Sequence, residues 1–153
     1  MRAGGECAPE AVAVVRTMDL ACRSGVPRIV CLAVDSLHKL VAFGFVSGWM
    51  PPVSASTSRE RISEGTERVR AIDAVVATVA AQEAQRDAGV QLAVLKACLT
   101  AVTAPAGDLH EAALMRAFRT CFNLHLAGAT PLVAATATGT LRQAVHHVFA
   151  QYE

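Results

Sequence analysis

The sequence predicts an all-α fold: a right-handed α-solenoid of the armadillo or HEAT type with about six helices. Apolar residues recur at helical spacing, and the strict alternation typical of strands is never sustained. Proline or a capping residue stands at most of the expected helix starts. The inner segments are apolar on nearly all sides, which is typical of helices packed between others. No repeat period is visible in the letters, so the solenoid prediction does not come from periodicity.

The composition predicts one domain covering residues 1–153, since a chain of 153 residues can bury a single core. Although 53% of its residues are hydrophobic, no run approaches the ~20 apolar residues of a membrane-spanning helix. The best run, 29–34, stops at Asp35. The first residues contain no apolar signal segment, so a cytosolic location is expected.

Charge and cysteine content exclude several functions. A formal net charge of +1 creates no field for a nucleic-acid backbone, so nucleic acid is not an expected partner. Five cysteines are scattered without a C-x-x-C pair. They are expected to be buried thiols in a reducing compartment, without zinc or redox work.

The first expected helix runs from Pro9 to about Ser24, because proline is favourable at a first helical position and Gly25 can end a helix. One face of it would carry Val12, Val15, Met18 and Cys22.

A second expected helix opens at Pro27 and ends at a turn over residues 43–48. Its apolar residues cover more than one stripe, so we expect neighbours on several sides. Asp35 and Lys39 on its polar edge form an i,i+4 pair worth about 0.2–0.5 kcal/mol.

Proline and serine without any period predict a mobile loop at about 49–60. The third helix follows, and Gly89 is expected to separate it from the fourth. One face of the third helix would carry Ile62, Val69, Ile72, Val76 and Val79. One face of the fourth would carry Leu92, Leu95, Leu99 and Val102.

For the fifth helix, Asp108 and Glu111 have capping-box spacing. Thr130 is the expected N-cap of a sixth helix, which would end near Tyr152 and have a weak or kinked turn at 136–140. The fifth helix runs through Met115, Phe118, Phe122 and Leu126. The apolar face of the sixth would carry Leu141, Val145, Val148, Phe149 and Tyr152.

No motif predicts catalysis, a cofactor or a metal. His110 and Glu111 begin a zincin-like string, but Leu114 stands where the second histidine is needed. His146 and His147 are adjacent and would point about 100° apart on a helix. There is no nucleophile elbow and no glycine-rich phosphate loop.

Surface residues are the remaining candidates for function. Arg116, Arg119 and Asn123, at i, i+3 and i+7, form a polar ridge that is either a docking surface or an ordinary solvated face. Phe43 and Phe45 flank Gly44 at a turn, where aromatic side chains can anchor a partner or pack beneath the loop. Lys39 completes the candidate partner-binding set.

Several co-linear segments resemble the dimerisation and cyclophilin-binding (DCB) domain of the large, brefeldin-A-inhibited Arf guanine-nucleotide exchange factors. They are residues 26–30 and 33–44, residues 90–103, and residues 119–127 with 135–143. Phe43 stands where the family pattern has tyrosine and His38 where it has glutamine. The order and the gaps are those of the family.

The resemblance implies a non-catalytic, armadillo-like module at the start of a large Arf exchange factor that acts in vesicle transport at the trans-Golgi network. Its implied partners are a second DCB domain, the neighbouring HUS region, an Arf-like small GTPase and, for part of the family, cyclophilin. Membrane association would be peripheral and through partners. The catalytic exchange domain is absent from this chain. A generic armadillo or HEAT scaffold that binds a peptide or helix is the alternative interpretation.

Overall fold

The computed structural model describes residues 5–51, 68–104 and 109–151. These residues form six helices and no extended sheet, which confirms the all-α prediction. The helices are α1 (Pro9–Cys22), α2 (Pro27–Ala42), α3 (Ala71–Ala80), α4 (Ala88–Thr103), α5 (Glu111–Ala127) and α6 (Pro131–Ala150). None of these helices is both long enough and apolar enough to cross a membrane.

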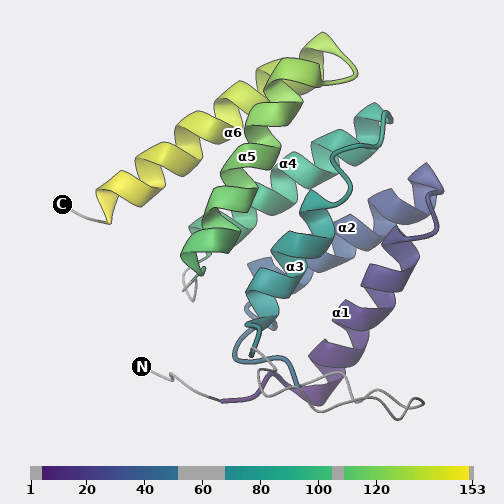
Figure 1. The fold of residues 1–153 in the computed structure, drawn as a ribbon, viewed down its shortest axis with the longest axis vertical. Helices are drawn as coiled ribbons and strands as arrows, with labels where there is room; N and C mark the ends of the chain where they lie inside the picture. The colour runs from purple at the N-terminus through teal and green to yellow at the C-terminus, as the bar shows by residue number, and fades with distance from the viewer. Residues whose placement is uncertain (1–4, 52–67, 105–108, 152–153) are drawn as a thin grey trace, which may run out of the picture.

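The helices pair into three hairpins, α1–α2, α3–α4 and α5–α6, which stack side by side (Figure 1). Helices α1, α3 and α5 form one layer, and α2, α4 and α6 form the other. The first hairpin does not contact the third, so each hairpin packs only on its neighbour. Such stacking is consistent with a helical solenoid.

Local signals placed several helix ends correctly. Proline occupies the first turn of α1, α2 and α6, where its missing N–H leaves no hydrogen bond unmade. The Thr130 hydroxyl caps α6 by accepting a hydrogen bond from the Val133 N–H at 3.3 Å. Gly25 has a φ of 69° in the α1–α2 turn. The predicted starts of these three helices are therefore confirmed.

The starts of α4 and α5 differ from the prediction. Gly89 lies inside the first turn of α4, because Asp87 is the N-cap and its carboxylate accepts from the Val90 N–H at 3.0 Å. The N-cap of α5 is His110, whose Nδ1 accepts from the Ala112 N–H at 3.3 Å. Asp108, predicted for that role, lies outside the described residues.

The chain between α2 and α3 is anchored at both ends. Trp49 pairs with Glu6 and with Arg70 in isolated β-bridges, and the Met50 N–H donates to the Val69 carbonyl at 2.9 Å. Helix α3 thus begins only at Ala71, and the prediction that Val69 belongs to it is wrong. Most of the loop predicted at 49–60, and Ile62, lie outside the described residues.

Helix α4 is central to the core, since it packs against every other helix except α1. Its side chains Val90, Val94 and Leu95 are completely buried. Gln91, only 3% exposed, bridges two connections: its Nε2 donates to the Gln85 carbonyl, and its Oε1 accepts from the Ala129 N–H, both at 2.8 Å. This bridge ties the α3–α4 connection to the α5–α6 connection.

Helix α6 buries a face that only partly overlaps the predicted one. Leu141 and Val148 pack against the core, and Tyr152 lies outside the described residues. Val145 and Phe149 are exposed, whereas the buried residues are mostly small, which lets α6 lie close to α4 and α5. The helix is continuous through residues 136–140, where the hydroxyls of Thr136 and Thr138 donate to carbonyls one turn earlier. The buried set is Val133, Ala137, Thr140 and Ala144.

Candidate interaction surface

A shallow groove runs between α3 and α5 on the face formed by α1, α3 and α5. Its volume is about 230 Å³. On the α3 side it is lined by three alanines, Ala77, Ala80 and Ala81. On the α5 side it is lined by Thr120 and by two members of the predicted ridge, Arg116 and Arg119. Helix α3 thus presents only methyl groups where α5 presents long cationic side chains.

The groove lining also contains a negative charge. Glu83, which follows α3, lines the groove and accepts a hydrogen bond from the Asn123 Nδ2 at 3.2 Å. The ridge therefore divides into two parts. Asn123 holds Glu83 in place, whereas Arg116 and Arg119 are exposed and make no ion pair within the described residues.

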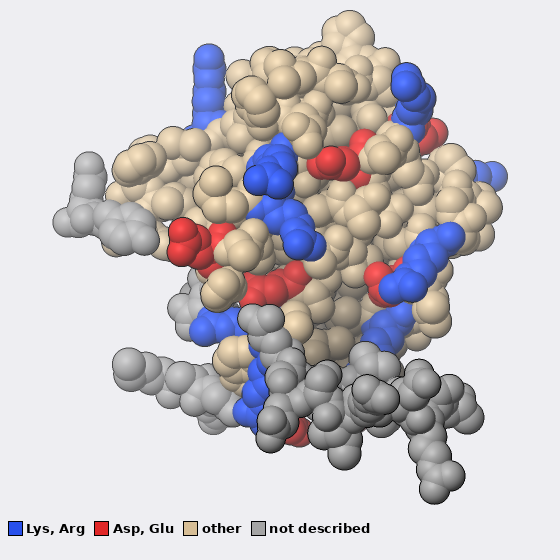
Figure 2. Space-filling model, in the orientation of Figure 1, with Lys and Arg blue, Asp and Glu red and all other residues tan. Residues whose placement is uncertain are grey.

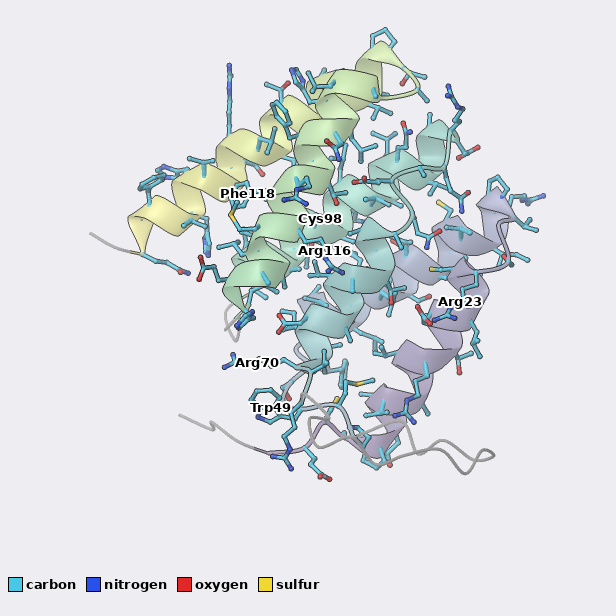
Figure 3. All side chains as sticks on the ribbon, in the orientation of Figure 1. Arg23, Trp49, Arg70, Cys98, Arg116 and Phe118 are labelled. Carbon is cyan, nitrogen blue, oxygen red and sulfur yellow. The ribbon has the colours of Figure 1, made fainter. Side chains whose placement is uncertain are left out.

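Basic and acidic side chains lie close together on this face. Figure 2 shows basic side chains over α5 in the middle of this face, with acidic side chains beside them. Figure 3 shows Arg116 extending from α5 towards α3. The sequence predicted the arginines but not Glu83 or the three alanines on the α3 side, Ala77, Ala80 and Ala81, which we call the alanine floor. The signal for the floor was present, because alanines at 77, 80 and 81 share one helical face.

A second candidate surface lies at the end of α2, where the turn is rigid. Gly44 has a φ of 75°, which favours glycine, and its N–H donates to the Val41 carbonyl at 3.1 Å. The Phe45 N–H donates to the Leu40 carbonyl at 2.9 Å, which completes a Schellman motif. Phe43 and Phe45 are 73% and 62% exposed. They do not pack beneath the turn.

Lys39 is held near these aromatics by ion pairs. Its Nζ lies 2.8 Å from Asp35, and the Lys96 Nζ of α4 lies 3.4 Å from the same carboxylate. The hydrogen bond from Lys39, supported by Lys96, lowers the pKa of Asp35 below its usual value. The predicted Asp35–Lys39 pair is therefore confirmed. This group is separate from the groove, because α2 and α5 do not contact each other.

Helix α5 also exposes an apolar stripe. Met115, Phe122 and Leu126, separated by seven and four residues, are 56%, 52% and 68% exposed. They lie on the side of α5 opposite to its buried residues, such as Ala117 and Leu124. The helix therefore has two apolar faces, of which only one belongs to the core. Exposed apolar side chains at helical spacing are typical of surfaces that bind other proteins.

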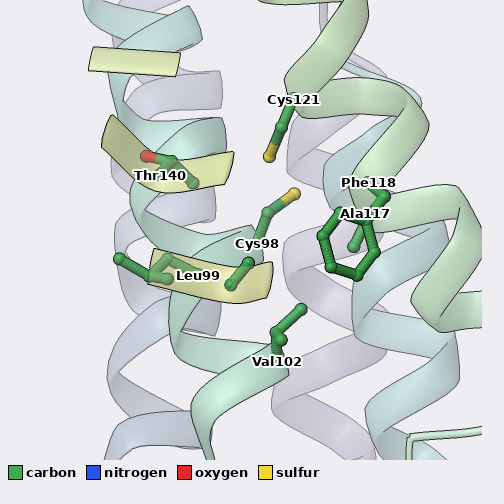
Figure 4. Close-up of a pocket in the computed structure, with 8 residues that line it drawn as sticks. Cys98, Leu99, Val102, Ala117, Phe118, Cys121 and Thr140 are labelled. Atoms are coloured by element: carbon green, nitrogen blue, oxygen red, sulfur yellow. The ribbon is translucent and has the colours of Figure 1, made fainter. Parts of the chain in front are cut away.

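A small apolar pocket between α4, α5 and α6 contains Cys98 and Cys121, whose sulfur atoms point towards each other (Figure 4). The hydrogen bond between the thiols, followed by burial, raises the pKa of Cys98 well above its usual value. The thiol therefore stays protonated. Within the described ranges, no three His, Cys, Asp or Glu side chains are grouped to hold a metal ion.

Comparison with known families bears on the two interpretations of the sequence. Residues 6–153 match the model of the Mon2/Sec7/BIG1-like dimerisation and cyclophilin-binding domain, DCB. The chain belongs to the DCB family. Brefeldin A-inhibited guanine nucleotide-exchange protein 1 of Homo sapiens is 37% identical over 137 residues, which is 88% of this chain. The same protein of Rattus norvegicus gives the same values. Protein 3 of Arabidopsis thaliana is 32% identical over 130 residues, 85% of this chain.

The DCB match covers all six helices and both groups of candidate residues. It favours the exchange-factor interpretation over a generic armadillo or HEAT scaffold. The chain spans only 7% of the length of these relatives. The activity of these longer proteins therefore cannot be assigned to this chain from the match alone.

Proposed function

We propose that this chain is a non-catalytic regulatory and assembly module of a large Arf guanine-nucleotide exchange factor. It brings two exchange-factor chains together and contacts the HUS region. It also helps to recruit the protein to the trans-Golgi network by binding an Arf-like GTPase. The DCB match over residues 6–153, together with relatives named as exchange proteins, carries the proposal.

The geometry of the domain supports a docking role. Its hairpins are packed into one stack, so the exposed residues of each helix have fixed relative positions. Among them are the apolar side chains Met115, Phe122 and Leu126 on α5 and the aromatic turn at the end of α2. Apolar and aromatic residues presented on rigid elements are typical of protein interfaces.

Self-association is the most direct property to test. Sedimentation velocity of the purified chain over a range of concentrations is expected to show a monomer–dimer equilibrium. The α5 stripe is the expected contact, so Phe122→Ser should shift the equilibrium towards monomer. Val14→Ser is the matched control, since Val14 is an exposed apolar residue on α1, away from α5. A chain that is monomeric at every concentration contradicts the assembly role.

GTPase binding requires a separate measurement. Immobilised chain is expected to retain an Arf-like GTPase loaded with a non-hydrolysable GTP analogue and to release it in the GDP form. Phe43→Ala and Phe45→Ala test the aromatic turn, because an exposed aromatic anchor is a typical hot-spot residue. Equal retention in both nucleotide states, or none in either, would count against recruitment by a GTPase.

A further inference from the structure

The α3–α5 groove has two arginines that bind nothing within the described residues. We propose that this groove binds an acidic amphipathic helix from a partner protein. The inference rests on the proposed role as an assembly module and deepens it by naming the chemistry of one partner. The helix places small or apolar side chains on the alanine floor and carboxylates on Arg116 and Arg119.

The spacing of the arginines determines the spacing of the acids. Arg116 and Arg119 are three residues apart on α5, so they lie about one helical turn from each other. Two carboxylates at i and i+3 or i+4 on a docked helix have the same separation. Each guanidinium can hold a carboxylate with two parallel hydrogen bonds, which fixes direction as well as position.

Some charged side chains elsewhere on the surface are already paired. Arg23 lies 2.8 Å from Asp19, and Lys39 lies 2.8 Å from Asp35. The groove arginines make no ion pair within the described residues, and Glu83, the acid in the groove lining, accepts a hydrogen bond from Asn123. The charge of the two guanidinium groups therefore remains available to an outside carboxylate.

The alanine floor indicates a helix as the occupant. The distance between two packed helices depends on the side chains at the contact. Ala77, Ala80 and Ala81 end at the β-carbon, so a helix can lie close to α3 while its edge stays within reach of the arginines. The open volume of about 230 Å³ accommodates apolar side chains from the docked face. Helices that bind in grooves commonly use such a set of spaced anchors.

The charge pattern favours a protein segment over an anionic membrane. A lipid surface is attracted by several basic residues without a fixed partner geometry. Here Glu83 adds a negative charge to the same groove, and the net charge of the whole chain is only +1. Attraction is therefore local to the two guanidinium groups. It selects a ligand that positions carboxylates on them and keeps away from Glu83.

Fluorescence anisotropy with a labelled synthetic helix tests the proposal on the full chain. The probe has alanine and leucine on one face and glutamates four residues apart beside it. The double variant R116A/R119A is expected to bind about tenfold more weakly, as is typical for the loss of two exposed ion pairs. Ala81→Leu, which fills the exposed edge of the groove, should also weaken binding. The matched control R28A/R142A removes two exposed arginines of α2 and α6 and should bind as the parent chain does.

Several results would overturn the proposal. They are an absence of binding, equal binding by a probe with glutamine in place of glutamate, and an equal loss in R28A/R142A. Arginine-dependent binding of phosphatidylserine vesicles without peptide binding would assign the groove to a membrane. Conversion of a dimeric chain to monomer by R116A/R119A would assign it to a second copy. If dimerisation and GTPase binding persist while the probe fails to bind, only this inference is lost. Far-UV circular dichroism of each variant verifies folding.

Discussion

The buried amide of Gln91 provides the sharpest test of how the hairpins are held together. Gln91→Leu removes both hydrogen bonds of the bridge, one to the Gln85 carbonyl and one from the Ala129 N–H, each 2.8 Å long. A net contribution of about 0.5–1.5 kcal/mol per hydrogen bond gives about 2 kcal/mol for the pair. Gln85 and Ala129 are not buried, so water can replace the hydrogen bonds that they lose. The larger free-energy penalty of a buried, unpaired polar group is therefore not expected.

Urea unfolding followed by circular dichroism measures this effect. Gln91→Leu should lower the midpoint without changing the slope, and the melting temperature should fall by about 4–8 °C for a domain of this size. Amide exchange should accelerate at the Ala129 N–H, whose acceptor is lost. The control Gln143→Leu alters an exposed glutamine of α6 and should change the free energy of unfolding by less than about 0.5 kcal/mol. Equal stability of Gln91→Leu and Gln143→Leu would refute the bridge.

Three further predictions follow from local geometry. Gly128→Ala should destabilise the fold by about 1–3 kcal/mol in the same assay, because a β-carbon there would lie 2.6 Å from the Leu124 carbonyl oxygen; Gly139→Ala, with open space around it, should instead stabilise the fold by about 0.5–1 kcal/mol. Iodoacetamide should label the native chain first at Cys31, the one cysteine that is not buried, and mass spectrometry that finds a buried cysteine labelled first would contradict this. Lys39→Ala should raise the pKa of Asp35 in a carboxyl NMR titration, because the Lys39 hydrogen bond is the main cause of the lowered value. Since the pKa of Asp35 is lowered in the folded state, the ion pair stabilises the fold at neutral pH, and this contribution is lost as the pH falls through the folded-state pKa. An Asp35 titration midpoint that is the same in Lys39→Ala and in the parent chain would contradict the assignment.

Helix starts could be predicted wherever a local signal determines them. Proline at the first turn and a capping threonine act through residues next to them in sequence, so α1, α2 and α6 begin where expected. Asp87 is also a local capping signal, but Gly89, two residues later, indicates a break between the helices, so Asp87 was not predicted as the N-cap. His110 as the N-cap of α5 was missed because histidine is not among the residues that commonly cap helices.

The buried faces of the last hairpin were harder to predict. Helical periodicity shows that apolar residues share a face but does not show which of two faces meets the core. On α5 the larger side chains, Phe122 and Leu126, point outwards, while Ala117 packs inside. The close approach of α5 and α6 selects small residues, and that approach depends on the whole stack. The groove could not be predicted for the same reason: the spacing of the two arginines can be read from the sequence, but the helix that lies opposite them depends on the packing of the whole stack.

The hydrogen bond between Met50 and Val69 makes the connection between α2 and α3 suitable for insertions. The Met50 N–H and the Val69 carbonyl oxygen are 2.9 Å apart, so one residue that follows α2 and one that precedes α3 are held side by side. The span between them can then change in length without moving α2 or α3. The closure entropy of a loop rises by only about 0.6 kcal/mol with each doubling of its length. This junction is accordingly the position at which a fluorescent reporter or an additional domain can be inserted while the three hairpins keep their packing.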